Sequence, residues 1–221
     1  MPRPRKPLIS RETAVRAGLE VIDEHGLDAF SLPMVAHKLN VKAPSLYHHF
    51  RDKSEVLAEI ARQILLDAEE PRRLPTDDWQ EALIGLSIAA RRAILRHPKA
   101  APLLLLYPPR HQMLASYERG LRMYEKRGIK PELLMSVALG LDNILMGAAL
   151  TSAYARSNGL PPFPVYDPAA FPSLATAFKS NPFDEEELFA GTVRAFLEGI
   201  AKLSTDLVPA AKASVVRAGK A

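Results

Sequence analysis

The sequence contains no cysteine. This absence excludes disulfide bonds, zinc–thiolate sites and thiol nucleophiles, and it agrees with a protein of the reducing cytoplasm. The chain also lacks an uninterrupted apolar run of about 18 residues, the length that indicates a membrane-spanning helix. The N-terminal segment MPRPRKPLIS has no apolar stretch of a secretory signal. We therefore expect a cytoplasmic protein with no membrane partner.

Sequence patterns of catalysis are also missing. The chain has no glycine-rich phosphate loop, no HExxH pair, no acidic metal cluster and no nucleophile–base pattern. We therefore expect no enzymatic activity, no cofactor and no metal site. The composition that remains is 48% hydrophobic and 24% charged, as in a globular protein. The net charge of +4 is compatible with binding to nucleic acid, although charge alone is a weak indication.

Nearly every segment shows the 3.6-residue apolar spacing of a helix, and none alternates between apolar and polar residues as a strand does. We therefore predict an all-α fold. The expected helices cover approximately residues 11–24, 31–40, 44–49, 52–70, 77–97, a short helix ending at 107, 110–127, 131–157 and 184–206. Six prolines in 158–182 predict a long loop with one helical turn near Leu174–Phe178.

The segment 31–49 has the dimensions of a helix-turn-helix, two short helices joined by a tight turn at Asn40. The second helix would lie in the major groove of DNA. Leu46 and Phe50 are four residues apart and would face the core. The side chains left outside carry a cation, hydroxyls and imidazoles, the groups that bind phosphates and base edges; they are Lys42, Ser45, Tyr47, His48 and His49.

Other interpretations of these side chains remain. Tyr47 would also suit a half-buried packing position. His48 and His49 do not predict a metal pair, because adjacent helical residues point in different directions. Lys53 begins the next helix, where free backbone N–H groups would help to hold a phosphate. Three basic residues near the N-terminus are either a solvated end or an arm that contacts DNA; they are Arg3, Arg5 and Lys6.

The stretch TAVRAGLEVIDEHGLDAFSLPMVAHKLNVKAPSLYHHFRDKSEVLAEI resembles the N-terminal domain of the tetracycline-repressor (TetR/AcrR) family. The signature elements are Gly26, the helix MVAHKLNV and the run SLYHHFRDKSEVL. DDWQEALIGLSIAARRAILRHP, the Tyr107–Pro108–Pro109 turn and the long helix after Gly128 resemble the C-terminal domain of tetracycline repressors in order and spacing. The resemblance covers most of the chain.

The resemblance implies a DNA-binding transcriptional regulator, most simply a repressor, that contacts operator DNA through residues at matching positions. Base contacts are implied for Lys42, Ala43, Pro44 and Ser45, and phosphate contacts for Ser31, Tyr47, His48 and Lys53. One position departs from the family. Where tetracycline repressors read a base with arginine, this chain has Pro33, so its operator must differ.

We expect a helix-turn-helix DNA-binding domain over residues 1–56, including the basic arm, and a larger ligand-binding and dimerisation domain over 57–206. A flexible tail would follow over 207–221. The helix at 131–157 is apolar on almost every side, which requires burial all round. One face would line a pocket and another would meet a second subunit, as in the four-helix dimer interface of the family; a monomer core is the alternative. Gly140 and Gly147 would permit a close helix approach.

Asp142 and Asn143 interrupt this apolar helix, and buried polar groups need partners. They would fix the register of a subunit interface or orient a ligand. Other candidates for the effector pocket are Trp79, Leu83, Leu86, Leu104, Tyr107, Met113, Tyr117, Leu121 and Met146.

Tetracycline repressors bind a magnesium–drug chelate through histidines, whereas this chain has Glu69 and Leu104 at the matching positions. Because leucine cannot ligate a metal, we expect an apolar effector in place of magnesium–tetracycline. Two further alternatives remain, a helical ligand-binding protein without a DNA function and a transcriptional activator of the same fold.

Overall fold

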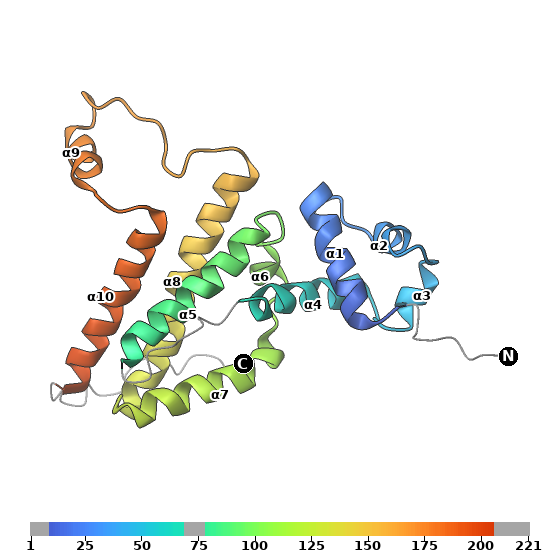
Figure 1. Ribbon diagram of the computed structural model, residues 1–221, viewed down its shortest axis with the longest axis horizontal. Helices are drawn as coiled ribbons and strands as arrows, with labels where there is room; N and C mark the ends of the chain where they lie inside the picture. Colours follow the sequence, from blue (N-terminus) through green and yellow to red (C-terminus); the bar gives the residue numbers. More distant parts are fainter. Residues whose placement is uncertain (1–8, 69–77, 206–221) are drawn as a thin grey trace, which may run out of the picture.

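A computed structural model describes residues 9–68 and 78–205, and every regular element in these ranges is an α-helix (Figure 1). The helices are α1 (Arg11–His25), α2 (Leu32–Lys38), α3 (Pro44–Tyr47), α4 (Lys53–Leu66), α5 (Trp79–Arg96), α6 (Leu103–Leu106), α7 (Arg110–Lys126), α8 (Pro131–Ser157), α9 (Pro172–Ser180) and α10 (Glu185–Thr205). The basic arm, Glu69 and the 207–221 tail lie outside the described residues. The predicted all-α class is confirmed.

The first three helices and the start of α4 form a small N-terminal head (Figure 1). The Ser10 side chain caps α1 by accepting from the backbone N–H of Thr13, and Gly26 ends the helix at a φ of 85°. Pro33 lies in the first turn of α2, where its missing N–H costs no helical hydrogen bond. Asn40 supplies the left-handed turn between α2 and α3, with a φ of 53°.

Helix α4 leaves the head and enters the larger domain (Figure 1). Gly18 allows α1 to pack closely on it, because a Cβ at this position would lie 2.8 Å from the Ile60 side chain. Ile64 continues the same hydrophobic cluster into the larger domain, where it joins Ile94 and Leu103. The head and the larger domain therefore share one core, with α4 running through it.

A polar contact also joins the two parts. His97, directly after α5, lies 2.6 Å from Asp23 of α1 through Nδ1 and Oδ2. Lys99 donates to the backbone carbonyls of Asp23 and Glu24 at 2.8 and 3.1 Å. A cation near the C-terminal end of a helix is favourable because the helix dipole is negative there.

In the larger domain α5, α8 and α10 pack on one another and α7 packs on α8. Their shared core includes Leu83, Val137, Val193 and Leu197. The buried Arg91 of α5 ties the three helices together, donating to Glu185 of α10 at 2.6 Å and to Ser152 of α8 at 3.1 Å.

Three predicted elements differ in extent from the structure. The helix expected to reach about residue 70 has its last described turn at Leu66, and α3 stops at Tyr47, short of 49. The single turn expected near Leu174–Phe178 is the nine-residue helix α9. Pro172 pre-sets its first turn, and Phe178 packs against Phe163 of the preceding loop with ring centroids 4.8 Å apart.

Helix α8 is long and apolar enough to cross a membrane by length and composition alone, with a mean hydropathy of 1.8 in its most apolar window. The search for an uninterrupted apolar run of about 18 residues did not detect this helix. Such a helix is weak evidence for a membrane span, since core helices of other proteins pass the same test. Here α8 packs against α5, α7 and α10, but only 22% of that window is buried, so the expectation of burial all round is wrong for the single chain.

Candidate DNA-binding surface and effector cavity

The short helix α3 turns one side to the core and the other outward. Leu46 and Phe50 are 1% and 2% exposed, as their spacing predicts. Tyr47 is 57% exposed, so the packing alternative for this residue is wrong. The remaining predicted contact residues lie in or beside the helix-turn-helix; Lys42, Pro44 and His48 are exposed, whereas Ser31, Ala43 and Ser45 are half-buried.

Lys53 is exposed at the first position of α4, and its ammonium group already has a protein partner. It donates to the carbonyl oxygen of Phe30 at 2.7 Å and lies 5.4 Å from the centroid of the Phe30 ring. An ammonium group has three N–H donors, so this bond leaves donors for a phosphate. The contact fixes the Lys53 ammonium group at Phe30, in the turn before α2.

The sequence interpretation missed Arg11, which holds the residues directly after α3, the expected recognition helix of the helix-turn-helix. Its guanidinium lies 4.5 Å from the Phe50 ring centroid, donates to the His49 carbonyl, and pairs with Glu55 of α4 at 3.0 Å. One residue of α1 thus positions both α3 and the start of α4. No sequence signal links Arg11 to residues about forty positions away.

Glu55 is the anionic centre of this arrangement. Its carboxylate accepts from the backbone N–H of Arg51 at 2.8 Å and from the Arg11 side chain. These two hydrogen bonds lower the pKa of Glu55 from 4.5 to about 2. The backbone N–H of Glu55 in turn donates to the Asp52 cap at 2.8 Å.

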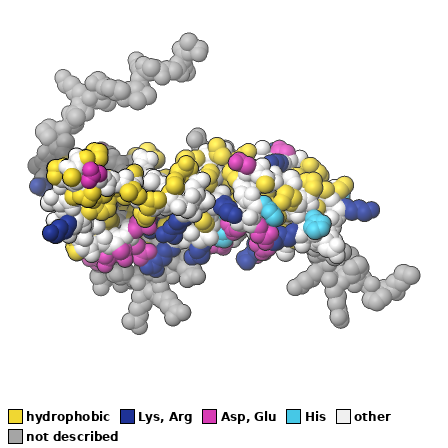
Figure 2. Space-filling model, turned by 90° about the horizontal axis from the view of Figure 1, so that it is seen from above, with side chains coloured by type: hydrophobic (Ala, Val, Ile, Leu, Met, Phe, Trp, Pro, Cys, Tyr) yellow, Lys and Arg dark blue, Asp and Glu magenta, His cyan; other side chains and the backbone are white. Residues whose placement is uncertain are grey.

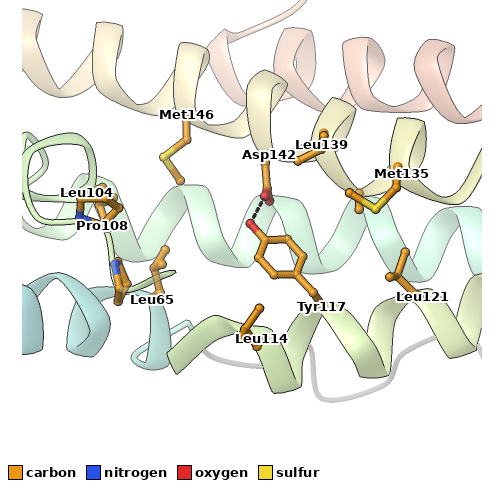
Figure 3. Close-up of a pocket in the computed structure, with 12 residues that line it drawn as sticks. Leu65, Leu104, Pro108, Leu114, Tyr117, Leu121, Met135, Leu139, Asp142 and Met146 are labelled. Carbon is orange, nitrogen blue, oxygen red and sulfur yellow. Dashed lines mark hydrogen bonds between the residues drawn. The ribbon is translucent and has the colours of Figure 1, made fainter. Parts of the chain in front are cut away.

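A cavity of about 390 Å³ lies between α4, the α6–α7 turn, α7 and α8 (Figure 3). This volume lies in the range of small-molecule sites. The wall is apolar apart from two side chains, Tyr117 of α7 and Asp142 of α8. The other lining residues are Leu65, Leu104, Pro108, Pro109, Leu114, Leu121, Met135, Ala138, Leu139 and Met146.

Tyr117 and Asp142 point toward each other across the cavity, and the Tyr117 hydroxyl donates to the Asp142 carboxylate (Figure 3). Burial and this bond raise the pKa of Tyr117 to about 12, so the phenol keeps its proton at neutral pH. Burial also raises the pKa of Asp142, against the opposing effect of the Tyr117 bond. A second cavity, of about 230 Å³, adjoins the first and shares the lining residues Tyr117, Ala138 and Asp142 with it.

The predicted pocket residues divide among several places. Leu104, Tyr117, Leu121, Asp142 and Met146 line the first cavity, and Leu83 and Leu86 line the second.

Three other candidates line neither cavity. Trp79 packs against the core of the larger domain, Tyr107 packs against the core shared with the head, and Asn143 is exposed. The side chain of Met113 lies outside the described part of the chain. The prediction missed Leu65, Met135 and Leu139, whose apolar side chains do not differ in type from those of an ordinary core.

Comparisons with known proteins agree with this architecture. Residues 14–60 match the profile described as bacterial regulatory proteins, tetR family, and residues 70–204 match the tetracyclin repressor-like C-terminal domain. The tetracycline repressor protein class D of Escherichia coli is 28% identical over 144 residues, which span 64% of this chain and 66% of that repressor.

Two further proteins extend the match. The class A repressor from transposon 1721, also of Escherichia coli, is 27% identical over 191 residues, 86% of each chain. The structure of Streptomyces coelicolor ActR in complex with actinorhodin superposes with a TM-score of 0.69 at 22% identity, covering 91% of this chain and 100% of that chain.

Proposed function

Because the chain belongs to the TetR family of bacterial regulatory proteins, which are DNA-binding transcriptional regulators, we propose that it is a repressor. A small apolar molecule that enters the larger domain would release it from its operator. The observation that carries the proposal is the position of α4. Its first residue, Lys53, lies in the head and donates to Phe30 at the turn before α2, and Leu65 in its last turn lines the larger cavity.

The DNA-binding part rests on the exposed face of α3. Lys42, Pro44, Tyr47 and His48 are accessible there, while Leu46 anchors the helix in the core. Selection from random DNA by gel shift should yield one preferred operator. Failure to select any sequence, with non-specific binding only, would contradict the repressor assignment.

The sensing part rests on the apolar wall of the cavity and its contact with α4. ActR, whose structure superposes on this chain, was solved in complex with actinorhodin. The effector must bind the DNA-free arrangement more tightly, since a ligand with equal affinity for both states shifts neither. A thermal-shift screen followed by an operator-release assay tests this. If every stabilising ligand leaves operator affinity unchanged, the sensing role is wrong.

We also propose that the protein acts as a cytoplasmic homodimer through α8 and α10. A stripe on α8 that includes Asn143, Gly147 and Tyr154 is exposed, and Leu188 and Leu203 are exposed on α10. Figure 2 shows hydrophobic side chains gathered toward the end of the molecule that carries α9 and α10. Such a patch is typical of a protein–protein interface.

In a dimer with two-fold symmetry, the recognition helices would lie about 34–36 Å apart on DNA, one helical repeat. Sedimentation at micromolar concentration should show a dimer. Leu188→Glu should give a folded monomer, because a charge would be buried at the interface. Leu105→Glu is the matched control, since Leu105 is 65% exposed on α6. A monomeric wild type would contradict the dimer.

A further inference from the structure

Asp142 differs from the other partly buried carboxylates that join helices. Glu185 pairs with Arg91 at 2.6 Å, and Glu55 pairs with Arg11 at 3.0 Å. Asp142 has a hydroxyl partner, Tyr117, and within the described residues no cation pairs with it. A charge in an apolar site is costly unless an opposite charge compensates it. The site therefore has an anion that a ligand could neutralise.

The same carboxylate is the only charged side chain that lines either cavity, among side chains that the structure describes. Around it the larger cavity offers leucine, methionine and proline side chains, among them Leu121, Met135 and Met146 (Figure 3). An apolar body would fill this space. A carboxylate on the ligand would instead face Asp142 as a like charge, which is unfavourable.

Tyr117 and Asp142 also form the wall between the two cavities, because both cavities include them. A ligand donor that replaces the Tyr117 hydroxyl on Asp142 would leave that phenol free to rotate.

We propose that the effector is a lipophilic cation, an apolar molecule with one protonated amine that pairs with Asp142 in place of the Tyr117 hydroxyl. This inference rests on the sensing role proposed above and names the ligand class for that same cavity. Asp142 is the specificity-determining residue, and Tyr117 covers its charge while the cavity is empty.

Three probes with one tricyclic body separate the charge from the apolar contribution. They are 9-(methylaminomethyl)anthracene, which is cationic at neutral pH, 9-anthracenemethanol, which is neutral, and anthracene-9-carboxylate, which is anionic. Each is titrated against the full-length protein by calorimetry. We expect the ammonium probe to bind about 10- to 100-fold more tightly than the carboxylate, the ratio given by a hydrogen bond to a charged group. The alcohol should fall between them.

Two variants locate the source of the preference. Asp142→Asn should bring the ammonium-to-carboxylate ratio close to one. Glu118→Gln is the matched control, since it removes one exposed carboxylate next to Tyr117 on α7 and outside both cavities, and it should keep the ratio. Tyr117→Phe should strengthen ammonium binding, because the competing hydroxyl is gone. Each ratio compares ligands on one variant, so a modest loss of stability does not affect it.

Equal binding of the three probes to the wild type, or tighter binding of the carboxylate, would overturn this inference and leave the apolar effector site standing. Retention of the ratio in Asp142→Asn would overturn it as well. If no probe binds, the inference is also wrong, and the operator-release screen then decides separately whether the protein senses any ligand.

Discussion

The contact between α8 and α10 at Gly140 gives a measurable prediction about the core of the larger domain. A Cβ built on Gly140 would lie 2.3, 2.8 and 3.1 Å from three ring atoms of Phe196. Carbon atoms in contact normally lie about 3.5–4.0 Å apart. Gly140→Ala therefore forces the Phe196 ring out of its place. Gly147 lies two turns further along α8, and a Cβ there meets nothing within 4 Å in one protomer.

The two glycines separate packing from helix propensity. Replacing a helical glycine with alanine should raise the free energy of unfolding by about 1 kcal/mol at either position, through helix propensity alone. Overpacking costs about 1–3 kcal/mol, and it applies at Gly140 alone. We therefore expect Gly140→Ala to be less stable than Gly147→Ala by about 1–3 kcal/mol. At about 2–4 °C per kcal/mol for a chain of this size, the Tm values should differ by about 2–12 °C.

Calorimetric unfolding of both variants at one protein concentration measures this difference. A Phe196→Ala background supplies the control, because without the ring Gly140→Ala should become stabilising. The reasoning is refuted if the two alanine variants have the same Tm, or if the cost at Gly140 persists after the ring is removed. Sedimentation of Gly147→Ala shows separately whether that position is covered in the dimer, since a close subunit contact there would weaken association.

Three further predictions concern the head and its link to the cavity. Lys53→Ala should weaken binding to all DNA sequences alike and lower the slope of log affinity against log salt concentration by about one. Lys42→Ala should instead change the preferred operator. An unchanged salt slope in Lys53→Ala would contradict the phosphate contact. Leu65→Ala should keep probe binding within a few-fold while raising the ligand concentration needed for operator release, and equal losses of both would contradict a transmitting role for α4. Glu55 has a folded pKa of about 2, below its ordinary 4.5, so its contribution to stability is complete above pH 4.5 and is lost as the pH falls toward 2. Urea midpoints at pH 7 and pH 3 should therefore differ less in Glu55→Gln than in the wild type, and an equal difference would contradict the shift.

The helix-turn-helix could be predicted because its signals are local. Leu46 and Phe50 are four residues apart and both are buried. Ser10 and Asp52 are N-cap residues of types that favour a helix start. Periodicity and capping chemistry therefore place these elements without tertiary information. Arg11 could not be predicted. Its role depends on α1 meeting the ends of α3 and α4, and no spacing rule reports that contact.

The cavity was predicted in part: the sequence singled out its polar side chains, Tyr117 and Asp142, and three of its apolar ones, Leu104, Leu121 and Met146. Asp142 is conspicuous as a charge inside an apolar helix, and the structure places it in the cavity wall. Leu65 and Met135 carry no such mark, because an apolar side chain has the same chemistry in a filled core and at the edge of a space. Which of them line the cavity depends on the angles between α4, α7 and α8, which the sequence pattern does not specify.

The head meets the larger domain both at α4 and at the His97–Asp23 contact, so a shift of α4 alone does not free the head. Ile60 and Ile64 are fully buried along α4, and packed contacts transmit displacement because the interior has little free volume. A ligand that moves Leu65 must therefore tilt α4 as a unit or disrupt that core. Since His97 holds the end of α1 at 2.6 Å, the tilt also works against this polar contact. The difference in effector affinity between the DNA-free and the DNA-bound arrangement therefore has to exceed both costs.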